Sequence, residues 1–322
     1  MQYAKLGRSG LKVSRLCLGT MNFGSFTSEK ESFQIMNRAL EIGINFFDTA
    51  NVYGGKKGEG ITEKIIGRWL EENKDRRNNI VLASKVYGEM GDRVNEKHLS
   101  AYHIKKACED SLKRLNTDHI DLYQMHHVHR ETPWDEIWQA MEQLIREGKI
   151  IYVGSSNFAG WDIAAANEEA RRRKLLGVIS EQSKYNLFNR NIEREMIPAC
   201  NYYGVGIIPW SPLEGGLLGG VIKKLNKGRR NTDEIVNKLK NNREQIEKWE
   251  NFCEDIGEDP ASTALAWLLN QPVITSPIIG PRTLQQLETS QRALEINLTK
   301  ESLSKLDAIF PPAGQSPQYY AW

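Results

Sequence analysis

The chain has few cysteines, and they lie far apart: Cys17, Cys108, Cys200 and Cys253 are the only four in 322 residues. No two of them form a C-x-x-C pair, which argues against a cysteine-based zinc site and against a disulfide framework. We therefore interpret them as reduced core residues of a cytoplasmic protein.

Long apolar runs are also absent. No stretch approaches the roughly twenty consecutive apolar residues that a membrane-spanning helix needs, and the first residues lack the charged and then apolar pattern of a signal peptide. The formal net charge is only +2, without a dominant basic patch, so neither nucleic acid nor an acidic partner is expected. With 40% hydrophobic and 26% charged residues, the composition is that of a soluble globular protein with no membrane partner.

Short apolar runs recur along the chain at a regular spacing. Between them lie segments such as residues 102–115 and 137–145, where apolar side chains return every three or four positions, as in amphipathic helices. Ser100 is placed as an N-cap and Gly148 as a C-terminal cap of such helices. The runs lie at residues 13–18, 44–47, 80–84, 120–125, 150–154, 177–181, 205–209 and 274–279.

Eight alternations of strand and helix predict an α/β fold of the (β/α)8 TIM-barrel class. No linker or change of composition divides the chain, so residues 1–322 are expected to form a single domain. The competing fold, a doubly wound sheet, would normally carry G-x-G-x-x-G after its first strand. Here that strand ends in Gly19-Thr20-Met21-Asn22, and Gly58-Glu59-Gly60 lacks the third glycine and follows no strand.

Two segments fall outside this alternation. Residues 1–11 are expected to form a hairpin that closes the bottom of the barrel and turns at Arg8-Ser9-Gly10. Residues 212–242 form a long connection after strand seven, first rich in glycine and then strongly basic. Long loops in compact domains are usually lids or binding loops.

Four ionisable residues follow or end the early runs: Asp48, Tyr53, Lys85 and His126. The carboxyl ends of barrel strands are where this fold places its chemistry. A phenol has a pKa near 10 and is a poor acid at neutral pH, so we expect the Lys85 ammonium to lower the pKa of Tyr53. Asp48 would hold that ammonium, and His126 would donate a hydrogen bond to a substrate carbonyl oxygen. The set fits carbonyl reduction.

Each of these residues also has an ordinary structural explanation, such as a helix cap or a surface lysine, and only their joint spacing favours catalysis. The run His126-His127-Val128-His129 raises the alternative of a metal site. Alternation along an extended chain would place His126 and His127 on opposite sides, and no carboxylate or cysteine clusters nearby, so we expect no metal.

Seven segments in order resemble the aldo-keto reductase family, in particular its branch of potassium-channel β subunits and aryl-alcohol dehydrogenases. The resemblance covers nearly the whole chain and implies a barrel that binds NADP(H), with Asp48, Tyr53, Lys85 and His126 as its catalytic residues. The segments are Asp48-Thr49-Ala50-x-x-Tyr53-Gly54, Lys85, residues 121–126, residues 148–158, Gln182-x-x-Tyr185-Asn186, residues 210–213 and residues 280–283.

The resemblance also implies a nicotinamide site. Ser156, Asn157 and Gln182 would hydrogen-bond the carboxamide, and the ring of Trp210 would stack against the nicotinamide. Around the pyrophosphate, glycines would let backbone N–H groups approach. The residues assigned to the rest of the cofactor are Gly19, Thr20, Met21, Ser211, Leu213, Gly215, Gly216 and Gly280.

A helix start follows strand eight, because Thr283-x-x-Gln286 has the pattern of a capping box. With Arg282 beside it, this helix N-terminus is suited to an adenosine 2′-phosphate, which favours NADP over NAD. Arg229 and Arg230 are further candidates for the same phosphate.

The expected partner is a small carbonyl compound, an aldehyde or a ketone, and the sequence does not specify which. Phe23, Tyr87 and His127 are expected to wall its cleft. The aromatic end of the chain, residues 317–322, would either cover the substrate mouth or pack on another subunit, which makes a homo-oligomer an open alternative.

Two other functions are weighed against the reductase. Channel-type relatives share residues 210–213 but carry Asn where this chain has His126, which favours an enzyme over an NADP(H)-binding, redox-sensing regulatory subunit. An unrelated barrel enzyme, such as an isomerase, would require the Ser156, Asn157, Gln182 and Trp210 set to be a coincidence.

Overall fold

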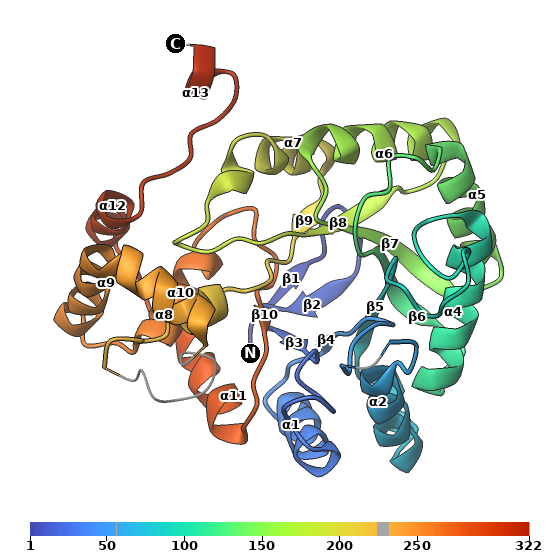
Figure 1. The fold of residues 1–322 in the computed structure, drawn as a ribbon, viewed down its shortest axis with the longest axis horizontal. Coiled ribbons are helices and arrows are strands. Elements are labelled where there is room, and N and C mark those ends of the chain that lie inside the picture. Colours follow the sequence, from blue (N-terminus) through green and yellow to red (C-terminus); the bar gives the residue numbers. More distant parts are fainter. Residues whose placement is uncertain (56, 224–231, 322) are drawn as a thin grey trace.

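The computed structural model describes residues 1–55, 57–223 and 232–321. Within them, eight strands form one parallel sheet in the order β10-β3-β4-β5-β6-β7-β8-β9, and Figure 1 shows the helices arranged around it. The strands are β3 (Cys17–Gly19), β4 (Phe46–Asp48), β5 (Val81–Val86), β6 (Ile120–Met125), β7 (Ile150–Ser156), β8 (Val178–Gln182), β9 (Gly206–Ile207) and β10 (Ile278–Ile279).

The two ends of this sheet meet and close a barrel. Ile207 of β9 forms a parallel bridge with Ile274, in the segment that leads to β10. The amide of Thr275 donates to the Ile207 carbonyl at 2.8 Å, and the amide of Ile278 donates to the Pro209 carbonyl at 2.9 Å. The predicted (β/α)8 barrel is therefore confirmed, and an open doubly wound sheet is excluded.

Helices connect the strands and pack on the outside of the sheet. The predicted caps are present: the hydroxyl of Ser100 accepts the His103 amide, and Gly148, with φ +69°, follows the end of its helix. The helices are α1 (Glu29–Glu41), α2 (Ile61–Glu72), α3 (Asp75–Asn78), α4 (Ala101–Leu115), α5 (Trp134–Arg146), α6 (Gly160–Arg172), α7 (Met196–Tyr203), α8 (Asp233–Asn241), α9 (Arg243–Asp255), α10 (Pro260–Leu269), α11 (Leu284–Gln291), α12 (Lys300–Ile309) and α13 (Gln318–Ala321).

Alternation along the strands sorts side chains between the helices and the barrel interior. Phe47 joins the larger core with the helices, whereas Phe46 joins a second core of ten buried residues contributed by the strands and the hairpin. Because side chains two apart on a strand share a face, Asp48 follows Phe46 into the interior, and Lys85 follows Ala83. Period-two alternation thus aims both ionisable groups at the same space.

The predicted hairpin is present but extends beyond residues 1–11: β1 (Tyr3–Lys5) pairs antiparallel with β2 (Lys12–Ser14), with Tyr3 opposite Ser14. Its Leu6 and Val13 belong to the interior core. The predicted first barrel strand, residues 13–18, was therefore wrong at its start, because residues 12–14 pair within the hairpin. Arg15 separates the two elements: its guanidinium donates to the carbonyls of Leu269 and Ile274 at 2.6 and 2.5 Å.

The last strand is also shorter than predicted, since only Ile278–Ile279 of residues 274–279 is regular strand. Pro277 has no amide to donate and interrupts the ladder. The connection after β9 is likewise not one continuous loop, because α8 occupies residues 233–241 of it. Arg229 and Arg230 lie outside the described residues. Among the described helices, none has the length and apolar character needed to cross a membrane.

Candidate active site

Asp48, Lys85 and Tyr53 meet at the carboxyl ends of β4 and β5. Lys85 Nζ donates to Asp48 Oδ2 at 2.6 Å, to the Thr49 carbonyl at 2.9 Å and to the Tyr53 hydroxyl at 3.2 Å. The Lys85 side chain is fully buried, and that of Asp48 is 3% exposed. The structure therefore brings three of the four predicted catalytic residues into one hydrogen-bonded chain.

His126 completes the group from the end of β6. Its ring centroid lies 5.8 Å from that of Tyr53, edge to face at 80°. Burial, with the nearby charge of Lys85, lowers the pKa of His126 to about 2. The imidazole is therefore neutral at neutral pH and carries one N–H donor without a positive charge.

The protonation of Tyr53 differs from the sequence-based expectation. Burial raises the pKa of Tyr53 above its ordinary value, and the Lys85 ammonium lowers it without reversing the shift. Lys85 therefore acts in the predicted direction, but the net shift is upward, because a buried phenolate loses its hydration and also lies near the Asp48 carboxylate. Burial lowers the pKa of Lys85, but Asp48 and Tyr53 outweigh it and raise that pKa. At neutral pH the pair is a neutral phenol beside an ammonium.

A glutamine that the sequence analysis missed extends this group. Gln124 Nε2 donates to Asp48 Oδ1 at 3.0 Å, and Gln182 Nε2 donates to the same oxygen at 2.9 Å and to Gln124 Oε1 at 3.1 Å. Gln124 is fully buried. Its position two residues after Leu122, an interior residue of β6, was the signal that would have identified it.

The predicted carboxamide set, Ser156, Asn157 and Gln182, is contiguous with the four predicted catalytic residues. Ser156 Oγ donates to the Gln182 carbonyl at 2.7 Å, and Asn157 Nδ2 donates to the His126 carbonyl at 3.1 Å. Trp210 Nε1 donates to Asn157 Oδ1 at 3.0 Å, and Trp210 is 36% exposed. The indole is thus fixed by its N–H while part of its surface faces solvent.

The segment after Trp210, residues 211–216, is here called the strap. Four of its residues have left-handed backbones: Ser211 (φ +54°), Glu214 (+48°), Gly215 (+69°) and Gly216 (+113°). The amide of Gly215 donates to Ser211 Oγ at 3.3 Å, and that of Gly216 to the Leu213 carbonyl at 2.9 Å. Both glycine amides predicted for the pyrophosphate therefore have protein partners within the strap.

Glu214 anchors the strap, and the sequence analysis missed it. Its carboxylate is buried and accepts hydrogen bonds from Lys184 at 2.6 Å, Lys238 at 2.8 Å and Asn186 at 2.9 Å. Lys238 belongs to α8, whereas Lys184 and Asn186 follow β8. The carboxylate therefore joins three segments that are distant in sequence.

The predicted phosphate site lies at the start of α11. Thr283 is the N-cap and accepts the Gln286 amide at 3.3 Å. Gln286 Oε1 accepts the Arg282 amide at 2.8 Å, so the side chain reaches one residue further back than a capping box requires. The Arg282 guanidinium lies 4.4 Å from the ring centre of Phe26.

The remaining predicted cofactor residues lie at the carboxyl ends of β3 and β10. Thr20 donates to the Asp48 carbonyl through its amide at 3.0 Å and its hydroxyl at 2.9 Å. Met21 is 45% exposed. Gly280 follows β10, and its carbonyl accepts Asn22 Nδ2 at 2.8 Å. A side chain at Gly19 would meet Ile278 Cγ2 at 2.5 Å, so glycine there allows close packing of β3 and β10.

Tyr87 and His127 lie together beside His126. The His126 and His127 rings are stacked, 5.2 Å apart at 13°, and the Tyr87 ring lies 5.2 Å from that of His127. The expected opposite orientation of the two histidines was wrong, because β6 ends at Met125 and strand alternation no longer applies. Within the described residues, no group of three His, Cys, Asp or Glu side chains is arranged to hold a metal.

Phe23 does not lie on an exposed wall. It is fully buried and belongs to the main hydrophobic core. Its predicted contact with substrate is therefore corrected to a packing role beneath α2, where its carbonyl accepts the Thr62 hydroxyl at 3.0 Å.

The end of the chain contacts Arg194, in the segment between β8 and α7, while Tyr319 and Tyr320 stay 55% and 74% exposed. The ring centre of Tyr319 lies 4.0 Å from the Arg194 guanidinium, and the Ser316 amide donates to the Arg194 carbonyl at 2.8 Å. Tyr319, Arg194, Lys184, Lys238 and Glu214 are among the residues that line a hollow of about 610 Å³.

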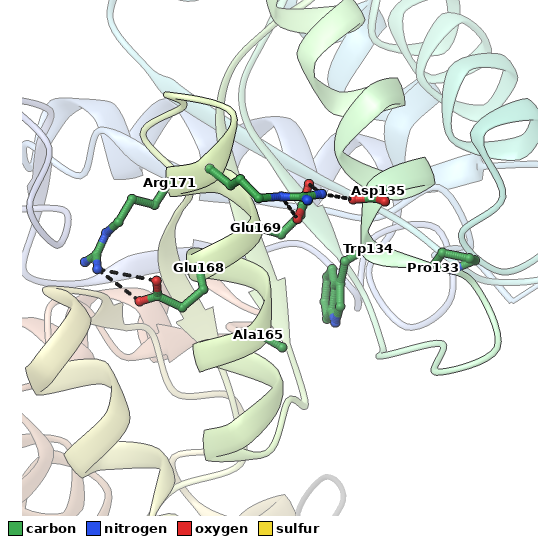
Figure 2. A pocket seen from close by; sticks show the side chains of 8 residues that line it. Pro133, Trp134, Asp135, Ala165, Glu168, Glu169 and Arg171 are labelled. Carbon is green, nitrogen blue, oxygen red and sulfur yellow. Dashed lines mark hydrogen bonds and ion pairs between the residues drawn. The ribbon is translucent and has the colours of Figure 1, made fainter.

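A second hollow, of about 730 Å³, lies on the outer surface between α5 and α6. Its charged groups pair with one another: Arg171 pairs with Glu168 at 3.1 Å, as Figure 2 shows, and Arg172 pairs with Asp135 at 2.7 Å. None of the four predicted catalytic residues lines it.

Comparisons with known proteins agree with this architecture. A closed parallel barrel with a tyrosine, a lysine, an aspartate and a histidine gathered at its carboxyl end has the architecture of a barrel oxidoreductase. The family model described as the aldo/keto reductase family matches residues 15–310. The chain belongs to this family, and the predicted resemblance is confirmed.

Relatives match over nearly their full lengths. The uncharacterized oxidoreductase YrpG of Bacillus subtilis (strain 168) is 52% identical over all of both chains. Versiconal hemiacetal acetate reductase of Aspergillus parasiticus is 33% identical, with 98% of this chain and 99% of that protein covered. A probable voltage-gated potassium channel subunit beta of Oryza sativa subsp. japonica is also 33% identical, with 96% of each chain covered. The chain is an oxidoreductase of the aldo/keto reductase family.

Proposed function

We propose that this protein reduces aldehydes or ketones to alcohols with NADPH, and that residues 1–322 act as one catalytic unit. The observation that supports this most directly is the continuous hydrogen-bonded path from Tyr53 through Lys85 and Asp48 to Gln182. A proton donor and a member of the carboxamide set are thereby joined through a single buried carboxylate. Carbonyl reduction needs both at one place, because a proton must reach oxygen as hydride reaches carbon.

The residues at this site fit a nicotinamide dinucleotide. Asn157 and Gln182 present amide groups beside the catalytic chain, and Trp210 has a fixed and partly exposed indole. In this proposal Ser156, Asn157 and Gln182 hold the carboxamide and the indole packs against the ring, which fixes the face that meets the substrate. The cofactor, when bound, supplies the hydride.

Tyr53 is the proposed general acid. Its raised pKa keeps the phenol protonated at neutral pH, so the proton is present for reduction, and the phenolate needed to oxidise an alcohol is scarce. Lys85 stabilises the phenolate that forms when the proton leaves, at 3.2 Å from the oxygen. Neutral His126 would hydrogen-bond the carbonyl oxygen and orient it towards Tyr53.

Arg282 and the start of α11 support NADPH over NADH. A helix N-terminus attracts negative charge, and Arg282 adjoins the N-cap Thr283. An adenosine 2′-phosphate carries the charge that distinguishes the two cofactors. Arg229 and Arg230 remain further candidates for this phosphate.

The Tyr53→Phe variant tests this function. It removes the acidic proton but keeps the ring that packs beside His126. We expect kcat for aldehyde reduction to fall by about 10² to 10⁴-fold, the usual contribution of a general acid, while NADPH binding measured by tryptophan fluorescence stays nearly unchanged. Turnover close to the wild-type rate would contradict the proposal.

The alternative is an NADP(H)-binding, redox-sensing regulatory subunit of the channel-β type; the rice relative is a probable voltage-gated potassium channel subunit beta. His126 beside Tyr53 supports an enzyme instead, because a cofactor-binding subunit has no need for a donor to a substrate oxygen. Oxidation of NADPH by a panel of aldehydes separates the two, since a regulatory subunit would bind NADPH without consuming it.

A further inference from the structure

Glu181 is a buried carboxylate that the proposed reaction does not use directly. It lies in β8, one residue before Gln182, and is fully buried. It accepts hydrogen bonds from the hydroxyl of Ser155, from Ser183 Oγ at 2.6 Å and from the Phe158 amide at 3.2 Å. The carboxylate is thus partnered by two hydroxyls and a backbone amide from two segments of the chain.

Each of these donors is the chain neighbour of one member of the carboxamide set. Ser155 precedes Ser156, Phe158 follows Asn157, and Ser183 follows Gln182. The strand register brings the two segments together, with Ser155 opposite Glu181 and Ser156 opposite Gln182. A single carboxylate therefore lies behind all three residues that would hold the nicotinamide carboxamide.

The local backbone shows why such an anchor is needed. Asn157 has a left-handed backbone, with φ +59°, a conformation that residues other than glycine adopt infrequently, asparagine more readily than most. The Asn157 amide donates to the Gln182 carbonyl at 3.1 Å, and the next amide, that of Phe158, donates to Glu181. These two bonds hold the turn that directs the Asn157 side chain towards His126 and Trp210.

A buried carboxylate is a costly way to hold a turn. Burial raises the pKa of Glu181 to about 7, against the hydrogen bonds from Ser155 and Ser183, which lower it. An apolar side chain would fill the space without this desolvation cost. What the carboxylate adds is several directed acceptors at one point, which fix the relative positions of the ends of β7 and β8.

We propose that Glu181 is a positioning residue that sets the geometry of Ser156, Asn157 and Gln182, and thereby selects for the nicotinamide carboxamide. This inference rests on the proposed function. It predicts an effect on recognition of the carboxamide group itself, beyond any effect on overall stability.

The probe is a pair of cofactors: NADPH, and its 3-acetylpyridine analogue, in which a methyl group replaces the carboxamide NH2. The measurement is the ratio of their dissociation constants, obtained by tryptophan fluorescence. Glu181→Gln keeps the shape of the side chain but replaces one acceptor oxygen with a donor. We expect Glu181→Gln to weaken the binding of NADPH at least fivefold more than the binding of the analogue. The wild-type preference for NADPH over the analogue would then fall by that factor.

Asp121→Asn is the matched control. Asp121 is another buried carboxylate of the barrel wall, and it accepts a backbone amide, that of Leu82, at 2.7 Å. It lies near the start of β6, at the opposite end of the barrel from the carboxamide set. This variant should lose stability, because Arg77 pairs with Asp121 at 2.8 Å, yet keep the wild-type ratio of dissociation constants.

Ser183→Ala provides a second variant if Glu181→Gln does not fold. It removes one hydroxyl from the carboxylate without placing a new polar group in the core, and it should shift the ratio in the same direction by a smaller factor. An unchanged ratio in the folded variants overturns the role of Glu181. Failure of the wild type to bind NADPH would instead overturn the proposed function, so the two failures are distinguishable.

Discussion

Replacement of Lys85 by methionine should be among the most damaging single changes to the folded protein. Lys85 is fully buried, and its ammonium lies 2.6 Å from Asp48 Oδ2, whose side chain is 3% exposed. Without the ammonium, a carboxylate is left in the barrel interior with amide donors from Gln124 and Gln182. Breaking a buried pair from one side typically costs about 3–5 kcal/mol, because an uncompensated charge remains.

A double-mutant cycle separates the free-energy cost of the unpaired Asp48 charge from the cost of lost packing. Methionine has a volume similar to that of lysine, so Lys85→Met leaves the core filled. Adding Asp48→Asn removes the unpaired buried charge and should recover more than half of the lost unfolding free energy. The unfolding free energy of the four proteins is measured by urea denaturation followed by circular dichroism. A loss below about 1 kcal/mol in Lys85→Met, or no recovery in the double variant, would refute the reasoning.

Three further predictions concern the reaction and the cofactor. Because the raised pKa of Tyr53 keeps the phenol protonated at neutral pH, kcat for reduction should be level around neutrality and fall only as pH rises through that pKa. The pKa of His126, about 2, predicts that this residue causes no decrease of kcat on acidification between pH 8 and 5. Such a decrease, if it disappears in His126→Gln, would contradict the prediction. Arg282→Ala should weaken the binding of NADPH about tenfold, as expected for loss of about 1.4 kcal/mol from one charge-assisted contact. The affinity for NADH, measured by the same tryptophan fluorescence titration, should not change. An equal loss of affinity for both cofactors would count against a 2′-phosphate contact. Gln124→Leu removes a buried donor to Asp48 and should lower kcat more than it changes KM in steady-state assays, whereas a change confined to KM would place Gln124 in substrate binding.

The sequence predicted the barrel well because its signals are local. Apolar runs of strand length and helical periodicity recur eight times, and the ends of these runs identified Asp48, Lys85 and His126 before any contact was known. The exceptions are at strand boundaries. Residues 12–14 pair within the hairpin, and pairing depends on a partner strand that the local pattern does not reveal.

The protonation state of Tyr53 and the buried contacts of Glu181 and Glu214 could not be predicted, since they depend on the surroundings that folding creates. The sequence shows that Lys85 and Tyr53 can meet, but the net pKa of Tyr53 follows from burial that only the packed barrel determines. Glu181 and Glu214 were missed for the same reason. The local sequence does not indicate that an acidic side chain is buried, because the hydrogen-bond donors that surround it come from other segments.

The short strands at the closure of the barrel have a consequence for how the protein responds to its cofactor. β9 and β10 have two residues each, and three backbone hydrogen bonds join Ile207 and Pro209 to residues 273–278. The strap follows β9 on one side of this closure, and Arg282 follows β10 on the other. A dinucleotide held by both would connect the two sides, so part of its binding free energy would appear as resistance of the barrel to opening. Protection from hydrogen exchange would increase most at the amides of Ile207 and Ile278.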